Sequence, residues 1–106
     1  MASGILGQSN ITAASTWTSV YTVPAGKVGT FNIGIVNLAT TTATIRVALA
    51  TSTSPTDAEM IEYDFFLAGS DVFERGGLVM QAAQKVVVQA SSLSPNISVI
   101  VTGYEE

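Results

Sequence analysis

The sequence contains no cysteine and no histidine, and few of its residues carry a charge. Without these two residue types there are no disulfides, no thiolate or imidazole metal ligands, and no histidine general base. Charged residues make up 11% of the 106 positions and hydrophobic residues 47%, whereas a typical soluble domain is about 25% charged. Because soluble monomers rarely expose large apolar patches, this composition predicts contact with other protein chains.

Basic residues are scarce and scattered, and the formal net charge is −4. The four cations are Lys27, Arg46, Arg75 and Lys85. Binding to nucleic acid or to an anionic membrane requires clustered basic side chains, so we expect neither partner. Residues 1–15 lack the basic start and the apolar run of a secretory signal, and no apolar run approaches the roughly 20 residues of a membrane span.

Catalytic motifs are also missing. Without cysteine and histidine, a nucleophile needs a Ser–Lys pair or two carboxylates, and neither SxxK nor GxSxG spacing occurs. Carboxylates concentrate at Asp57, Glu59, Glu62 and Asp64. This cluster has three interpretations: a solvated face of a strand, a calcium-binding site, or the carboxylate pair of a glycosidase. The alternation of Glu62 and Asp64 with apolar residues favours the first. We therefore predict no enzyme, no cofactor and no metal site.

From Trp17 onward the apolar residues recur with a period of two, interrupted by short turns. The segments predicted as strands are Thr16–Val23, Val28–Asn37, Ala43–Ala50, Glu59–Leu67, Val72–Met80, Lys85–Ala90 and Ile97–Tyr104. Gly76 and Gly77 indicate a bulge, and Thr56 could cap a single helical turn before Met60. The pattern predicts an all-β, single-domain protein, an antiparallel, jelly-roll-like β-sandwich of about seven to eight strands.

The first residues differ from the rest of the chain. Residues 1–15 are small and polar and show no clear period. They are predicted to form an N-terminal arm, with the sandwich domain over residues 16–106. An arm that reaches onto a neighbouring subunit is favoured, and docking on its own domain is the alternative.

Several apolar residues fall on the side of a predicted strand that should face solvent. Ile61, Tyr63, Phe65 and Leu67 are expected to point inward, which leaves Phe66 on the opposite face. In the last strand, Ile100 and Tyr104 show the same outward parity. Together with Ile5 and Leu6 of the arm, these are the predicted interface residues: Phe66, Ile100, Tyr104, Ile5 and Leu6. A sugar-stacking platform built from aromatic residues is the alternative; its candidates are Trp17, Tyr21, Phe66 and Tyr104.

Three strand-and-turn segments resemble a known group of proteins. These are YTVPAGKV at 21–28, FNIGIVN at 31–37 and ATIRVALA at 43–50, with VIVTGY at 99–104 similar in character. The pattern resembles small β-sandwich virion proteins of tailed bacteriophages. The resemblance covers mainly residues 17–50 and includes no catalytic residue. It implies a structural role in a virus particle.

Composition and resemblance lead to one expectation. The chain is predicted to be a non-enzymatic capsid decoration (cement) protein located in the virion, where it bridges and stabilises major capsid subunits. The expected partners are phage capsid or tail proteins and further copies of the chain, in a homo-oligomer for which a trimer is favoured. The alternatives are a tail, neck or fibre component and a carbohydrate-binding module on a fibre.

Overall fold

The computed structural model describes residues 3–91 and 95–106, which form eight strands and one turn of 3₁₀ helix. The strands are β1 (Ser3–Ile11), β2 (Thr18–Thr22), β3 (Gly29–Asn37), β4 (Ala43–Ala50), β5 (Met60–Leu67), β6 (Val72–Met80), β7 (Lys85–Ala90) and β8 (Ile97–Glu105). The helical turn, η1, spans Asp57–Glu59. The fold is an antiparallel β-sandwich, as the sequence predicts.

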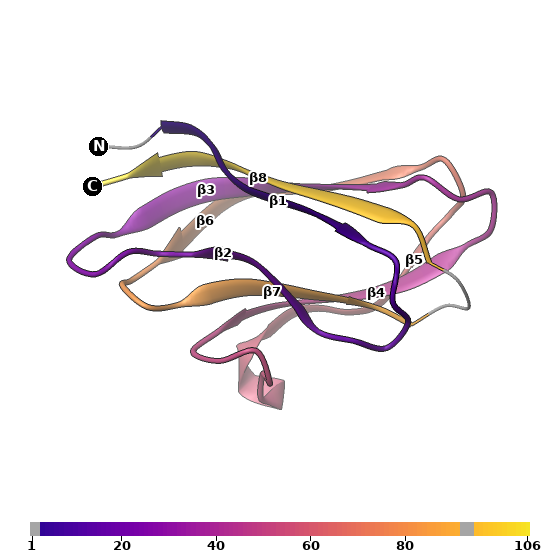
Figure 1. Ribbon diagram of the computed structural model, residues 1–106, viewed down its shortest axis with the longest axis horizontal. Coiled ribbons are helices and arrows are strands. Elements are labelled where there is room, and N and C mark those ends of the chain that lie inside the picture. Colours follow the sequence, from indigo (N-terminus) through magenta and orange to yellow (C-terminus); the bar gives the residue numbers. More distant parts are fainter. Residues whose placement is uncertain (1–2, 92–94) are drawn as a thin grey trace.

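The strands form two sheets of four. Sheet A has the order β1-β8-β3-β6, and sheet B has the order β2-β7-β4-β5. Figure 1 shows them as two layers, with both chain ends at the same end of the sandwich. The first strand thus pairs with the last, the second with the seventh, the third with the sixth and the fourth with the fifth. This nested pairing is the strand order of a jelly roll.

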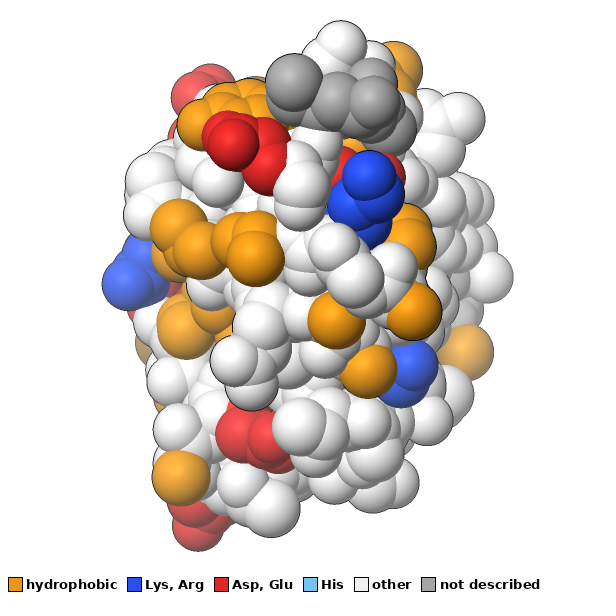
Figure 2. All heavy atoms as spheres, turned by 90° about the vertical axis from the view of Figure 1, so that its left-hand side faces the viewer, with side chains coloured by type: hydrophobic (Ala, Val, Ile, Leu, Met, Phe, Trp, Pro, Cys, Tyr) orange, Lys and Arg blue, Asp and Glu red, His pale blue; other side chains and the backbone are white. Residues whose placement is uncertain are grey.

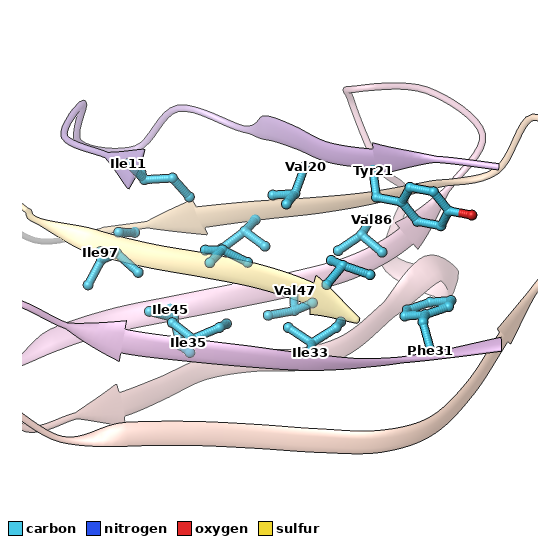
Figure 3. Packing of buried hydrophobic residues seen from close by; sticks show 14 of the residues in the cluster. Ile11, Val20, Tyr21, Phe31, Ile33, Ile35, Ile45, Val47, Val86 and Ile97 are labelled. Atoms are coloured by element: carbon cyan, nitrogen blue, oxygen red, sulfur yellow. The ribbon is translucent and has the colours of Figure 1, made fainter. Parts of the chain in front are cut away.

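The core fills the space between the two sheets. Inward positions alternate along β3 and β8, and they meet the inward residues of β4 and β7 (Figure 3). Phe31, Ile33 and Ile35 are buried here, as are Val86, Val88, Val99 and Val101. Their burial agrees with the period of two that predicts these segments as strands. Burial of apolar area at roughly 25 cal/mol per Å² provides the main stabilisation.

The predicted N-terminal arm is instead a strand of the sandwich. Residues 3–11 form β1, which pairs with β8 at the edge of sheet A; residues 1 and 2 lie outside the described part. The sequence of β1 shows no alternation of apolar and polar residues, because two of its inward positions are the small residues Gly7 and Ser9 and because a bulge follows Ile5. Gly7 is required because a Cβ at this position would meet the carbonyl oxygen of Val20 in β2. Residues 3–11 therefore dock on their own domain, which is the alternative that the sequence analysis gives to an arm on a neighbouring subunit.

A bulge in β5 corrects the parity predicted for that strand. Tyr63 and Asp64 together oppose one residue of β4, Arg46, and Asp64 has a positive φ of 54°. The extra residue reverses the faces of Tyr63 and Glu62, and a second register shift, between Val47 and Ala48, ends this reversal before Met60. Tyr63, expected inward, is exposed, whereas Glu62, expected on the solvent face, is only partly exposed. The bulge predicted at Gly76 and Gly77 is confirmed by the register shift opposite β3.

Candidate interaction surfaces

The outer face of sheet A is almost free of charge. Its outward positions form four rows across the strands, which the register defines as Ser3–Tyr104–Thr30–Val79, Ile5–Thr102–Asn32, Gln8–Ile100–Gly34–Glu74 and Asn10–Ser98–Val36–Val72. Glu74, at the sheet edge, is the one ionisable carboxylate in these rows. We call these residues the bare face, because no other described segment is packed over them.

The bare face carries four of the most exposed apolar side chains. Ile5 is 63% exposed and Val79 59%, and Val72 and Tyr104 are exposed as well. Ile100 lies on the central strand β8 and is 37% exposed. Beside it, Gly34 leaves an open hollow of about 380 Å³, whose lining also includes Asn32, Val72, Glu74 and Thr102 and, from an inward position of β6, Arg75. The face therefore combines protruding apolar side chains with a depression.

The outer face of sheet B, in contrast, is partly covered by the chain itself. Ala48, Ala50 and Val87 point outward from this sheet, yet each is fully buried. Trp17, which precedes β2, and Met60, at the start of β5, pack against them. This small second cluster keeps the middle of sheet B out of contact with water.

Three aromatic residues of β5 form a second exposed apolar surface, which we call the β5 aromatic edge: Tyr63, Phe65 and Phe66. Phe66 is 73% exposed, and its place opposite Thr44 puts it on the outer side of sheet B. Tyr63 lies under Arg46, whose guanidinium carbon is 4.2 Å from the ring centre. Phe65 contacts Phe73 of β6, with ring centres 5.0 Å apart. Phe65, expected to point inward, lies opposite the inward Ile45 and closes the side of the sandwich, where it is 37% exposed.

Most of the acidic cluster acts locally within the fold. The Glu59 carboxylate accepts hydrogen bonds from the backbone N–H groups of Thr56 (2.9 Å) and Thr51 (3.2 Å). These donors, Thr56 first, lower the pKa of Glu59 from its ordinary value. Glu59 thereby fixes the loop before β5, where the predicted helical turn is confirmed at η1.

Two ion pairs accommodate the other two carboxylates of β5. Arg46 donates to Asp64 at 2.6 Å, and this hydrogen bond raises the pKa of Arg46. Arg75 of β6 lies 3.4 Å from Glu62 and donates to the Ile61 carbonyl at 2.9 Å. The second contact joins the edges of the two sheets. Within the described residues no group of three or more acidic side chains could hold a metal ion.

One carboxylate is buried at the end of the sandwich that carries the termini. Glu105 of β8 accepts a hydrogen bond of 2.6 Å from the Tyr21 hydroxyl of β2. Burial, and then this hydrogen bond, raise the pKa of Tyr21 well above its ordinary value. The pair links sheet A to sheet B. Because Tyr21 is buried and Trp17 covers sheet B, these two rings do not form an exposed stacking platform.

The predicted interface residues lie on different surfaces. Ile5, Ile100 and Tyr104 share the bare face, whereas Phe66 lies on the opposite sheet. Leu6 does not belong to either surface, because its side chain packs against the core at the β1 bulge. Sequence reasoning missed Val72 and Val79, although their outward parity relative to Phe73 and Leu78 was readable.

Seen from the end that carries the termini, hydrophobic side chains appear as separate groups on a mostly uncharged surface (Figure 2). The described residues contain no helix long and apolar enough to cross a membrane. Comparison of the chain with known protein families, with curated protein sequences and with solved structures finds no match.

Proposed function

We propose that this chain is a non-enzymatic structural protein of a tailed-phage virion, which decorates the capsid and stabilises contacts between major capsid subunits. The observation that carries the proposal is the coexistence of two exposed apolar surfaces, the bare face and the β5 aromatic edge, on opposite sheets of one small domain. A protein with two such surfaces can bridge two neighbours. The resemblance of residues 17–50 to phage virion proteins supports the choice of particle.

The β5 aromatic edge is the surface we assign to the capsid. Aromatic residues are enriched where protein interfaces carry most of their binding energy. Phe66 offers a largely exposed ring to a partner, and Tyr63 is held by Arg46, so the Tyr63 ring loses little side-chain entropy when it is covered. Contacts that are weak singly become strong when linked copies of the chain bind one lattice at several points. Bound copies then favour the assembled shell over free subunits by mass action.

The test is binding to capsids that were assembled without this protein. We expect the purified chain to co-sediment with them and to raise the temperature at which the shells break. Phe66→Ser should lose most of both effects and keep the fold, because its side chain is largely exposed. The control, Val79→Ser on the other sheet, should retain capsid binding.

Other outcomes would contradict the proposal in distinct ways. Binding to isolated tails but not to capsids would assign the chain to the tail or neck. A specific ligand on a glycan array, lost in Phe66→Ser, would assign it to carbohydrate recognition. A map of the intact particle would locate the density and its symmetry.

A further inference from the structure

We infer that the bare face of sheet A binds the same face of a second copy of this chain, which makes the protein a two-fold symmetric dimer. This contact lies on the opposite sheet from the β5 aromatic edge, so it does not depend on the proposed capsid binding. Four features of the face point to a second copy as its occupant: its size, the complementarity of its shape, the placement of its charge and its lack of any cover.

The area is sufficient for a dimer. Four strands spaced about 4.8 Å apart, each about nine residues long at roughly 3.3 Å per residue, give a footprint of about 570 Å². Two such faces in contact bury more than the roughly 1,000 Å² that marks a specific interface. Aligned packing of two sheets through their faces is also the way in which β-sandwiches build their own cores.

The shape of the face is self-complementary about one axis. The sheet order β1-β8-β3-β6 places Ile5 and Ile100 on one half and the hollow at Gly34 on the other. A two-fold axis parallel to the strands, between β8 and β3, lays each half over the opposite half of the second copy. Ile100 of one copy then faces Gly34 of the other, and the reverse contact forms at the same time. Such reciprocity defines an isologous interface.

The same operation satisfies the charge on the face. Gln8, Ile100, Gly34 and Glu74 occupy one row, with Gln8 and Glu74 at its two ends. Rotation about this axis brings Glu74 over Gln8 of the second copy, whose side-chain amide can donate to a carboxylate. Within the four rows no two like charges meet. A partner with a charged surface would instead leave its charges unpaired against apolar side chains.

The proposed dimer differs from the trimer that the sequence analysis favours. A contact between two identical faces closes after two copies, whereas a trimer needs two different surfaces on each chain. A virus particle offers local two-fold positions at which such a dimer could bridge neighbouring capsid subunits through its two outward β5 aromatic edges.

Sedimentation of the purified chain over a range of concentrations tests the dimer directly. We expect a dimer that Ile100→Glu weakens about a hundredfold, because each dimer then brings the new carboxylate of each copy beside Glu74 of the other copy, and tenfold per copy is a modest cost. Phe66→Ser is the matched control, and it should leave the dimer unchanged. Far-UV circular dichroism checks that each variant retains the strands.

Exchange of the large side chain at position 100 with the glycine at position 34 tests the proposed axis specifically. Gly34→Ile should fill the hollow and weaken the dimer, although a Cβ at this position meets only the Ile100 carbonyl oxygen, 4.0 Å away, and so fits the monomer. Ile100→Ala should leave a gap. The double variant should regain at least part of the lost affinity, since the protruding and hollow positions have exchanged places.

The absence of cysteine permits a distance measurement as well. A spin label on Thr102→Cys of the bare face should lie close to its copy, whereas a label on Thr44→Cys of sheet B should lie farther from its copy, with two sandwiches between them. Monomers at all concentrations, a trimer, or a dimer disrupted by Phe66→Ser but not by Ile100→Glu would each overturn the inference.

Discussion

The outer faces of the two sheets contain similar small and apolar residues, but only those of sheet B are covered by other parts of the chain. On sheet B, Trp17 and Met60 pack over Ala48, Ala50 and Val87. These three residues are as fully buried as those of the core. On sheet A, comparable positions such as Ile100 remain exposed. The comparison teaches that apolar side chains outside the core have two uses in one small domain. One group stabilises the monomer, and the other remains available for a second chain.

The largest expected difference concerns a charge placed on each face. Val87→Asp should lower the free energy of unfolding by about 4 kcal/mol, because it buries an unpaired carboxylate beneath Trp17. Thr102→Asp, the matched change on the bare face, should change it by less than about 0.5 kcal/mol when the protein is monomeric. Urea unfolding at low protein concentration measures both. Equal losses would show that the two faces do not differ.

Removal of one aromatic ring from each face should give the next largest effect. Trp17→Ala should cost about 2 kcal/mol, less than the loss of a fully buried Trp, since the ring is partly exposed. Tyr104→Ala should cost the monomer about 0.5 kcal/mol and weaken association instead. Thermal unfolding, together with sedimentation, separates the two effects. A stability loss for Tyr104 as large as that for Trp17 would contradict the assignment of the bare face.

The hydrogen bond between Tyr21 and Glu105, which joins the two sheets, should make the stability of the protein sensitive to alkaline pH. The pKa of Tyr21 is raised above its ordinary value of 10.0. The unfolded chain therefore releases this proton first, and stability should fall as the pH rises above about 10 toward the pKa of the folded state. Below pH 10 this contribution is fully present. Unfolding by urea at a series of pH values measures the decline.

Two variants assign that decline to the pair. Tyr21→Phe should lose about 1.5 kcal/mol at neutral pH, because the buried carboxylate loses its donor, and it should remove the contribution of Tyr21 to the decline. Glu105→Gln should retain most of the decline in stability at alkaline pH, since burial is the larger cause of the raised pKa of Tyr21. An undiminished decline in Tyr21→Phe would exclude Tyr21 as its source.

The smallest expected change in stability comes from a substitution in the hollow of the bare face. Gly34→Ala should stabilise the monomer by about 0.5 kcal/mol, because glycine in a strand interior carries an entropic cost and the added methyl group meets open space. Gly103→Ala is the contrasting change in the same sheet, since its Cβ would run into the backbone of Thr30. It should destabilise the protein. Chemical unfolding of both variants checks the contrast.

Most of the fold could be predicted from local pattern. The limits of β4, β6 and β7 agree with the prediction because turn residues bound each of these segments. β1 was missed because its inward positions include Gly7 and Ser9, which carry no apolar signal. In β5 the alternation was misleading, since the bulge at Asp64 moved Tyr63 to the outer side.

The surfaces were harder to predict than the strands. Outward parity was sufficient to select Ile100 and Tyr104, because a strand alternates regardless of its neighbours, whereas Ile5 was selected only as an apolar residue of the predicted arm. Parity alone could not join them to Val72 and Val79, which lie in another strand of the same sheet. It also placed Phe66 in the same group, although Phe66 lies on the other sheet.

The sequence by itself determined an all-β sandwich with too little charge to cover both of its outer faces, because composition and a period of two do not depend on long-range contacts. Only the tertiary structure decided which face is left bare. Trp17 lies next to Val87 through the pairing of β2 with β7, strands far apart in the sequence. That pairing covers sheet B, and sheet A is left open to a second chain.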